Sequence, residues 1–180
     1  MLKKVVLAGG TGFVGQYFEK HSRNLGYEVR IISRQTHTGW EDKEGIRETI
    51  DHPYRNLVKF GMGGHQGSGN QKFSWIHIED LFNIVLFLRK NQELCGVFNC
   101  SSPHPVTNRE LMAHLRKLMN IRIGLPCPTP MLKMGAFFMG TETELIVKSR
   151  WVIPERLEKA GYAFKFHHLD EALEQILMNS

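Results

Sequence analysis

Residues 5–15 read Val-Val-Leu-Ala-Gly-Gly-Thr-Gly-Phe-Val-Gly, an apolar run that passes directly into a glycine-rich turn. The apolar run predicts a short buried strand over Lys3–Ala8. After the turn, apolar residues recur at helical spacing over Val14–Leu25, and Gly26 is suited to end that helix. A second apolar stretch, Glu28–Ser33, predicts another strand. Strand, turn, helix and strand in this order predict a βαβ unit with parallel strands.

The turn matches the pattern G-x-G-x-x-G at Gly10, Gly12 and Gly15. Between a strand and a helix, this pattern is typical of dinucleotide sites, because the glycines allow a tight turn and a close approach of the backbone to a pyrophosphate. The N–H groups at the start of the helix also favour phosphate. The alternative is a tight strand-to-helix turn without a ligand. We predict that the cofactor is bound by Gly9, Gly10, Thr11, Gly12, Phe13, Val14 and Gly15.

The choice of cofactor depends on the residues that follow the second strand. An Asp or Glu there holds the ribose 2′-hydroxyl of NAD, but this chain has Ser33 and Arg34, and Glu28 comes too early. A guanidinium suits the 2′-phosphate of NADP because it donates paired, charge-assisted hydrogen bonds. We therefore favour NADP(H), with NAD(H) as the alternative and a solvent-exposed loop arginine as the simplest interpretation of Arg34.

Composition limits the classes of protein and partner. The chain has 180 residues, of which 42% are hydrophobic and 23% charged, as expected for one ordinary globular protein. No apolar run is long enough to span a bilayer, and the first residues do not resemble a secretory signal, so we expect a cytoplasmic protein without a membrane partner. The net charge of +5 is spread among acidic residues, and no nucleic-acid motif is present. We expect a small-molecule substrate and no nucleic acid, and the oligomeric state is open.

The three cysteines, Cys95, Cys100 and Cys127, have no C-x-x-C spacing. We expect buried free thiols, neither a disulfide nor a metal site. His77 precedes two acids, Glu79 and Asp80, which is compatible with acid–base or metal chemistry. We favour a structural role, with Asp80 or Glu79 capping the following helix and His77 packing locally.

Periodicity predicts the remaining elements of the chain. Thr107 and Glu110 have the spacing of a capping box, as do Thr141 and Glu144. A glycine-rich segment, which lies between the βαβ unit and these capping boxes in the sequence, is expected to form a loop on the substrate side. The ranges are a charged helix over 41–50, the loop over 61–69, a strand over 72–76, a helix over 79–89, a strand over 97–100 and a last helix over 169–178.

Several segments together resemble one family. They are Val6–Gly15, Ile32–Arg34, Gly67–Gln71, Phe73–Leu81, Val97–Cys100, Pro105–Asn108 and Val152–Leu157, in that order. The chain resembles the extended short-chain dehydrogenase/reductases, specifically NAD-dependent epimerase/dehydratase-like proteins with an added C-terminal segment. The resemblance implies an α/β fold, a Rossmann-type doubly wound parallel sheet with a smaller C-terminal substrate-side part. Residues 1–50 would begin the dinucleotide-binding domain, and residues 51–180 would form the substrate-side region.

Part of the family pattern is absent. Family members have further strands, and a Ser and a Tyr with a Lys four residues later, where this chain has Ile50-Asp51-His52-Pro53. None of the tyrosines, Tyr17, Tyr27, Tyr54 and Tyr162, has a Lys at that spacing, so no catalytic residue is assigned. We expect that the central strands are missing from this sequence, because a truncated parallel sheet buries its faces poorly. The alternative is a shortened protein that is stabilised in another way.

The resemblance implies an NAD(P)-binding oxidoreductase or isomerase of the nucleoside-diphosphate-sugar-epimerase type with an unknown substrate. The alternative is a non-catalytic NADP(H)-binding or sensor protein that lacks the catalytic Tyr and Lys.

Overall fold

The computed structural model of the chain describes residues 4–8, 12–32, 51–128, 149 and 151–178. The backbone divides into two compact units, an N-terminal unit over residues 1–51 and a C-terminal unit over residues 52–180. Each unit has its own secondary structure and is described by itself.

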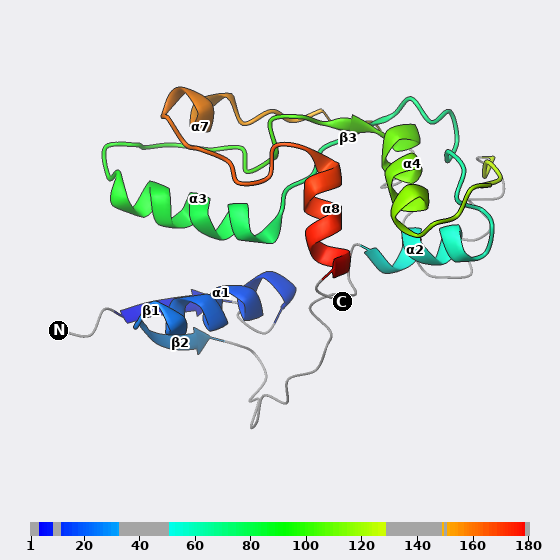
Figure 1. Ribbon diagram of the computed structural model, residues 1–180. Helices are drawn as coiled ribbons and strands as arrows, with labels where there is room; N and C mark the ends of the chain where they lie inside the picture. The colour runs from blue at the N-terminus through cyan, green and yellow to red at the C-terminus, as the bar shows by residue number, and fades with distance from the viewer. Residues whose placement is uncertain (1–3, 9–11, 33–50, 129–148, 150, 179–180) are drawn as a thin grey trace. The chain divides into compact units, whose positions relative to one another are not determined.

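The N-terminal unit is a βαβ arrangement of β1 (Lys4–Ala8), α1 (Phe13–Asn24) and β2 (Glu28–Ile32) (Figure 1). The two strands are parallel, and their register runs from Lys4 opposite Glu28 to Ala8 opposite Ile32. Helix α1 packs on both strands. The prediction of a strand, helix and parallel strand in this part of the chain is confirmed.

Helix α1 ends as predicted at Gly26, which lies in the left-handed region with φ +79°. The Gly26 N–H donates to the Arg23 carbonyl (2.9 Å), and the Tyr27 N–H donates to the Ser22 carbonyl (3.1 Å). These two bonds form a Schellman motif, which favours glycine at this position. The helix therefore ends early enough for the chain to return as β2 beside β1.

The C-terminal unit has mostly helices in its described residues. Short strands β3 (Lys72–Phe73) and β4 (Val106–Thr107) pair antiparallel, with Phe73 opposite Val106. The helices are α2 (Asp51–Lys59), α3 (Ile78–Lys90), α4 (Asn108–Leu118), α7 (Glu155–Lys159) and α8 (Leu169–Met178). The predicted helices over 79–89, after Thr107 and over 169–178 are confirmed by α3, α4 and α8. The predicted capping box at Thr107 and Glu110 is present in full.

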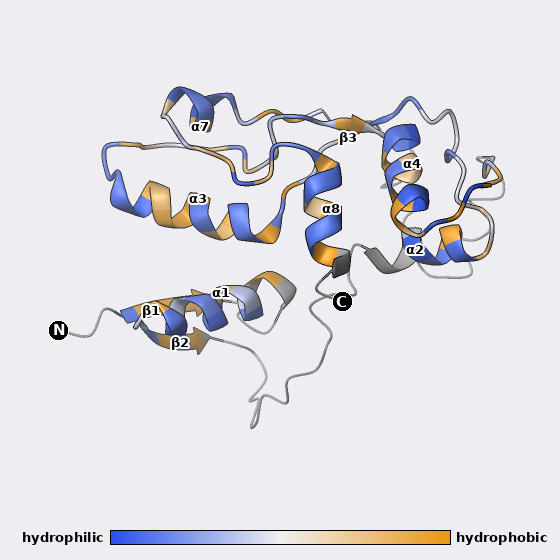
Figure 2. Ribbon diagram, in the orientation of Figure 1, coloured by the Kyte–Doolittle hydropathy of each residue, from blue (hydrophilic) through white to orange (hydrophobic). Residues whose placement is uncertain are grey.

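The core of the C-terminal unit consists of two apolar clusters. Figure 2 shows hydrophobic residues in orange along the helices of this unit. The larger cluster joins α2, α4 and α8 with the segments that follow β3 and precede α8. The smaller cluster joins α3 to α7 and the segment after it. The larger contains Val58, Trp75, Leu111, Met112, Leu115, Phe166, Leu169 and Ala172, and the smaller Ile84, Leu157 and Phe164.

Residues 51–59 form α2, a helix for which there was no prediction from the sequence, and Pro53 fits there because proline is tolerated in the first turn of a helix. Two expectations about local structure are corrected. The strand predicted over 72–76 is reduced to β3. Val97–Cys100 has no strand pairing, and side chains bond its backbone instead, since Arg156 donates to the Val97 carbonyl (2.6 Å). The helices expected over 41–50 and after Thr141 lie outside the described residues.

The glycine-rich segment over 61–69 packs against residues 124–127. The Leu125 N–H donates to the Gly61 carbonyl (2.8 Å), and the Gly64 N–H donates to the Leu125 carbonyl (3.0 Å). A Cβ atom on Gly64 would lie 2.5 Å from the Leu125 carbonyl carbon and the Pro126 nitrogen. Glycine at this position therefore allows two backbone segments to approach closely.

The cysteines differ from the expectation of buried thiols. Cys127 is buried, but Cys95 and Cys100 are exposed. Both exposed cysteines lie in the segment around Val97, which forms no strand, so its apolar residues are not buried against a neighbouring strand. No helix in the described residues is long and apolar enough to cross a membrane.

Candidate functional site

The N-terminus of α1 follows Gly12, which is the N-cap residue with φ −83° and ψ 170°. No side chain caps this end, and the first turn has no acidic residue. The Gln16 N–H donates to the Gly12 carbonyl (2.9 Å), so the helical hydrogen bonds begin there and the earlier N–H groups have no intrahelical acceptor. Gly12 itself is exposed. The combination of N–H donors without an intrahelical acceptor, a positive helix end and no side chain at Gly12 fits a phosphate group.

The register of the strands places the carboxyl ends of β1 and β2 at one edge of the sheet. Ala8 and Ile32 are partners at the carboxyl ends of β1 and β2. Gly9 follows Ala8 directly, and Ser33 follows Ile32. In parallel α/β sheets, nucleotides bind outside the carboxyl ends of the strands. The fold thus brings Ala8 and Ile32, the last strand residues before the two predicted binding segments, to the same edge.

The predicted cofactor residues are described only in part. Gly12, Val14 and Gly15 are placed at the start of α1, where Gly12 and Val14 are exposed and Gly15 is half-buried. Phe13 is the first residue of α1. The remaining predicted residues, which are Gly9, Gly10, Thr11, Ser33 and Arg34, lie outside the described residues, and their roles stay predictions.

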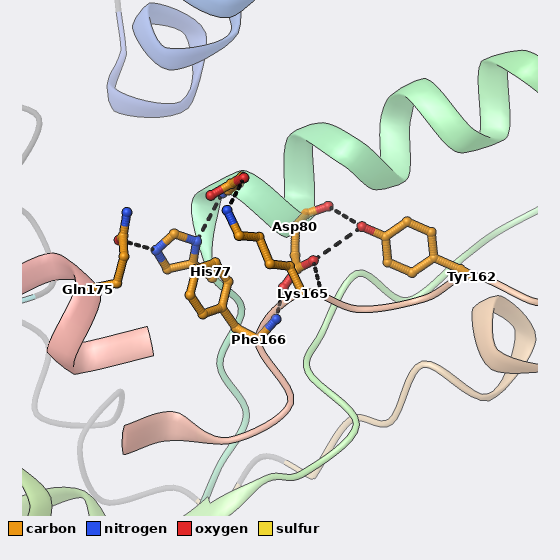
Figure 3. A network of polar contacts seen from close by, with 7 residues as sticks. His77, Asp80, Tyr162, Lys165, Phe166 and Gln175 are labelled. Atoms are coloured by element: carbon orange, nitrogen blue, oxygen red, sulfur yellow. Dashed lines mark hydrogen bonds and ion pairs between the residues drawn. The ribbon is translucent and has the colours of Figure 1, made fainter. Parts of the chain in front are cut away.

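A buried carboxylate organises the C-terminal unit (Figure 3). Asp80, on the first turn of α3, is 1% exposed. Its Oδ1 accepts from the Lys165 N–H (2.8 Å), and its Oδ2 accepts from the Phe166 N–H (3.0 Å). The Tyr162 hydroxyl also donates to Oδ1 (3.3 Å). Asp80 therefore fixes the segment 162–166, 82 to 86 residues later in the chain, onto the start of α3.

His77 caps α3, which corrects the expectation that Asp80 or Glu79 would do so. Its Nδ1 accepts from the Glu79 N–H (3.3 Å), and its Nε2 lies 3.0 Å from Gln175 Oε1 on α8. This pattern requires the neutral tautomer with the proton on Nε2. The ring also lies against Phe166, with centroids 3.9 Å apart. The expectation that His77 packs and bonds locally is confirmed, and burial lowers its pKa below the ordinary value.

These groups act as a scaffold more than as acid–base catalysts. Asp80 is occupied by two N–H donors and a hydroxyl, as buried charges in stable structures must be. Burial and the Asp80 carboxylate raise the pKa of Tyr162, and burial raises the pKa of Tyr54, so both phenols keep their protons. Among the described residues, no group of three or more His, Cys, Asp or Glu side chains is arranged to bind a metal ion.

Arg156 is a second anchor whose role the sequence did not reveal. Its guanidinium donates to the carbonyls of Cys95 (2.7 Å) and Val97 (2.6 Å) and lies 4.2 Å over the ring of Phe98. Arg156 belongs to the Pro-Glu-Arg-Leu stretch that supported the family resemblance, but spacing alone could not identify its distant partners. A hollow of about 400 Å³ next to it is lined by Val97, Asn99, Trp151, Val152, Ile153, Glu155 and Arg156.

Comparison with known proteins gives three kinds of likeness. Residues 127–176 match a family described as a domain of unknown function, DUF1731. An epimerase family protein of Staphylococcus aureus strain MW2 is 30% identical over 133 residues, which cover 74% of this chain and 42% of the relative. The chain thus spans less than half the length of this curated relative.

Two solved structures resemble the chain over nearly its whole length. The human epimerase family protein SDR39U1 (isoform 2), crystallised with NADPH, has a TM-score of 0.74 at 19% identity, covering 98% of this chain and 100% of that one. The dTDP-4-dehydrorhamnose reductase of Bacillus anthracis, in complex with NADP, has a TM-score of 0.64 at 10% identity, covering 100% and 99%. At these identities the likeness concerns the fold, which is the Rossmann-type α/β fold that the sequence predicted.

Proposed function

Because the chain belongs to the extended short-chain dehydrogenase/reductase superfamily, we propose that its N-terminal unit binds NADP(H) at the turn between β1 and α1. One observation supports this proposal above the others. The carboxyl ends of β1 and β2 are paired, and the α1 N-terminus beside them has neither a capping side chain nor an acid. The cofactors named for the human and Bacillus anthracis structures support the choice of a nicotinamide dinucleotide.

The residues of the turn have separate roles in this proposal. The N–H groups at the start of α1 bind the pyrophosphate, and the missing side chain of Gly12 lets the phosphates approach the backbone. Gly15, half-buried on α1, keeps the helix close to the strands. Arg34 pairs with the 2′-phosphate, which makes NADP(H) preferred over NAD(H). A bound nicotinamide would supply a hydride donor or acceptor for the reaction.

The activity proposed for the whole protein is that of an oxidoreductase or isomerase of the nucleoside-diphosphate-sugar-epimerase type. Its support is the name of the Staphylococcus aureus relative and those of the solved structures of similar fold. The substrate class beyond a small molecule is open, because fold likeness alone does not identify a substrate.

A non-catalytic NADP(H)-binding or sensor protein is the second candidate. The observation in its favour is that Tyr54 and Tyr162 have raised pKa values and no lysine four residues later. A proton donor for a carbonyl substrate needs a pKa near the working pH. These two tyrosines do not meet that requirement.

Calorimetric titration of the 180-residue chain with NADPH and with NADH tests cofactor binding. We expect tighter binding of NADPH, loss of this binding in Gly12→Val, and a reversed preference in Arg34→Asp. Since φ at Gly12 is negative, valine is conformationally allowed there, and the loss would reflect blocked phosphate approach. Lys20→Ala, on an exposed part of α1, is the matched control and should bind like the unaltered chain. Equal binding by Gly12→Val and the control would refute the site.

A turnover assay separates the two candidates once binding is established. The unaltered chain is incubated with NADPH and a nucleoside-diphosphate 4-keto sugar. Nicotinamide oxidation is followed by absorbance, and inversion at a sugar carbon is followed by NMR, because an isomerase consumes no net NADPH. Oxidation or inversion of the sugar supports the enzyme, whereas tight NADPH binding with neither supports the non-catalytic protein.

A further inference from the structure

We propose that the C-terminal unit docks onto anionic phospholipid bilayers through one exposed surface. This apolar–basic surface consists of Lys59, Phe60, Arg122, Ile123 and Leu125. The proposal concerns peripheral contact and is independent of cofactor binding.

Backbone hydrogen bonds bring the two segments of this surface together. Lys59 ends α2 and Phe60 follows it, directly before Gly61. The Gly61 carbonyl accepts from the Leu125 N–H (2.8 Å), so the end of α2 lies beside residues 122–125. Each segment contributes a basic residue followed by a large apolar one, Lys59-Phe60 and Arg122-Ile123.

The apolar side chains of this surface are exposed to an unusual degree. Phe60 and Ile123 are each 77% exposed, and Leu125 is 64% exposed. The position of Gly124 explains why Ile123 and Leu125 are exposed. A Cβ atom on Gly124 would lie 2.5 Å from the Gly63 carbonyl carbon, so that side of the segment faces the glycine-rich loop. Because side chains alternate along an extended backbone, Ile123 and Leu125 face the opposite side, which is solvent.

The two stretches of sequence that supply the surface carry charge of one sign. Residues 52–78 and 111–128, which supply both segments, contain no Asp or Glu. They contain Arg55, Lys59, Lys72, Arg116, Lys117 and Arg122. Figure 2 shows strongly hydrophilic and strongly hydrophobic residues next to one another along the segment that follows α4. Exposed basic residues beside outward apolar groups are complementary to an anionic interface that has an apolar interior.

The apolar groups favour a bilayer over other anionic partners. Aliphatic side chains such as Ile123 and Leu125 neither stack on bases nor bond to phosphates, so nucleic acid would leave them exposed. A bound peptide needs a groove, and the hollow beside Arg156 is lined by other residues. Turns that project apolar residues beside lysine and arginine suit insertion among lipid headgroups. The sequence-based expectation of no membrane partner rested on the lack of a spanning segment. The following experiment decides between that expectation and the proposed docking on a bilayer.

Sedimentation of the 180-residue chain with lipid vesicles tests the proposal. One set of vesicles is phosphatidylcholine alone, and the other contains about 30% phosphatidylserine, which gives a negative surface. We expect binding to the second set only, and weaker binding as salt is raised. Lys59→Glu with Arg122→Glu should lower the partition coefficient at least about tenfold, since each basic residue contributes about fivefold at such a surface. Phe60→Ser with Ile123→Ser should lower it by about tenfold by removing apolar insertion.

Matched controls test whether position matters. Val97→Ser removes an apolar side chain that is 82% exposed, and Lys90→Glu reverses an exposed charge at the end of α3. Neither residue belongs to the apolar–basic surface. These variants should bind vesicles like the unaltered chain, and circular dichroism checks that all variants fold. No binding to anionic vesicles, or equal losses in the control variants, would overturn the proposal. Binding to a single-stranded RNA but not to vesicles would also overturn it in favour of nucleic acid.

Discussion

The N-terminal and C-terminal units differ in what holds them together. Among the described side chains of the N-terminal unit, Val29 is the only buried hydrophobic residue, while Val6 is 58% exposed on β1. The C-terminal unit has two apolar clusters and a buried carboxylate that joins distant segments. The recognisable ligand motif thus lies in the unit with less internal packing. A motif that identifies a binding site does not indicate where the stability of a protein comes from.

The substitution expected to have the largest effect is Asp80→Asn, in the C-terminal unit. The substitution removes the charge and turns an amide donor toward the N–H groups of Lys165 and Phe166, and we expect the C-terminal unit to lose about 3 kcal/mol. Urea unfolding followed by circular dichroism measures the loss. Glu79→Gln is the control, because its ion pair with Lys165 is partly exposed and should contribute less than about 1 kcal/mol. Loss of NADPH binding in Asp80→Asn would show that the two units depend on each other.

A second test asks whether the glycine-rich loop contributes stability or only connects elements. In Gly64→Ala, the added Cβ meets the backbone of Leu125 and Pro126, which no side-chain rotation relieves. We expect a loss of about 2 kcal/mol in the same urea measurement. Asn70→Ala, at the exposed position directly after this loop, should change stability by less than about 0.5 kcal/mol. Equal effects of the two substitutions would mean that the close approach at Gly64 is unimportant.

The smallest expected effect concerns pH. Burial lowers the pKa of His77 below its ordinary 6.5, although the hydrogen bond with Gln175 and the charges of Glu79 and Asp80 oppose the shift and Lys165 adds to it. The unfolded chain therefore takes up the proton first as pH falls. Stability is full above pH 6.5 and declines as pH falls below that value toward the pKa of the folded state. The slope is at most about 1.4 kcal/mol per pH unit.

Unfolding at about pH 7.5 and about pH 5.5 measures this dependence. His77→Asn preserves a capping side chain but cannot take up the proton, so its stability should change less over this range. His167→Asn, at an exposed position, should retain the full dependence. An unchanged slope in His77→Asn would contradict the assignment.

The sequence predicted those features that depend on neighbours along the chain. The βαβ order, the end of α1 at Gly26, the capping box at Thr107 and helix α8 were found because periodicity and capping act over a few residues. The role of Asp80 was missed because its partners are 85 and 86 residues away. The strand expected over 97–100 failed for the related reason that a strand needs a pairing partner, and in this segment side chains such as Arg156 bond the backbone. At the candidate site the sequence identified the glycine turn, while the pairing of Ala8 with Ile32 required the structure.

The three thiols can report on local unfolding because they differ in exposure. All three cysteines belong to the C-terminal unit, where Cys95 and Cys100 are exposed and Cys127 is buried beside His65, whose carbonyl accepts from its N–H. An alkylating reagent will therefore modify two sites in the folded protein and a third only when the packing around residues 61–69 opens. The mass added over time would measure the rate of that opening in a single segment of the unsubstituted protein.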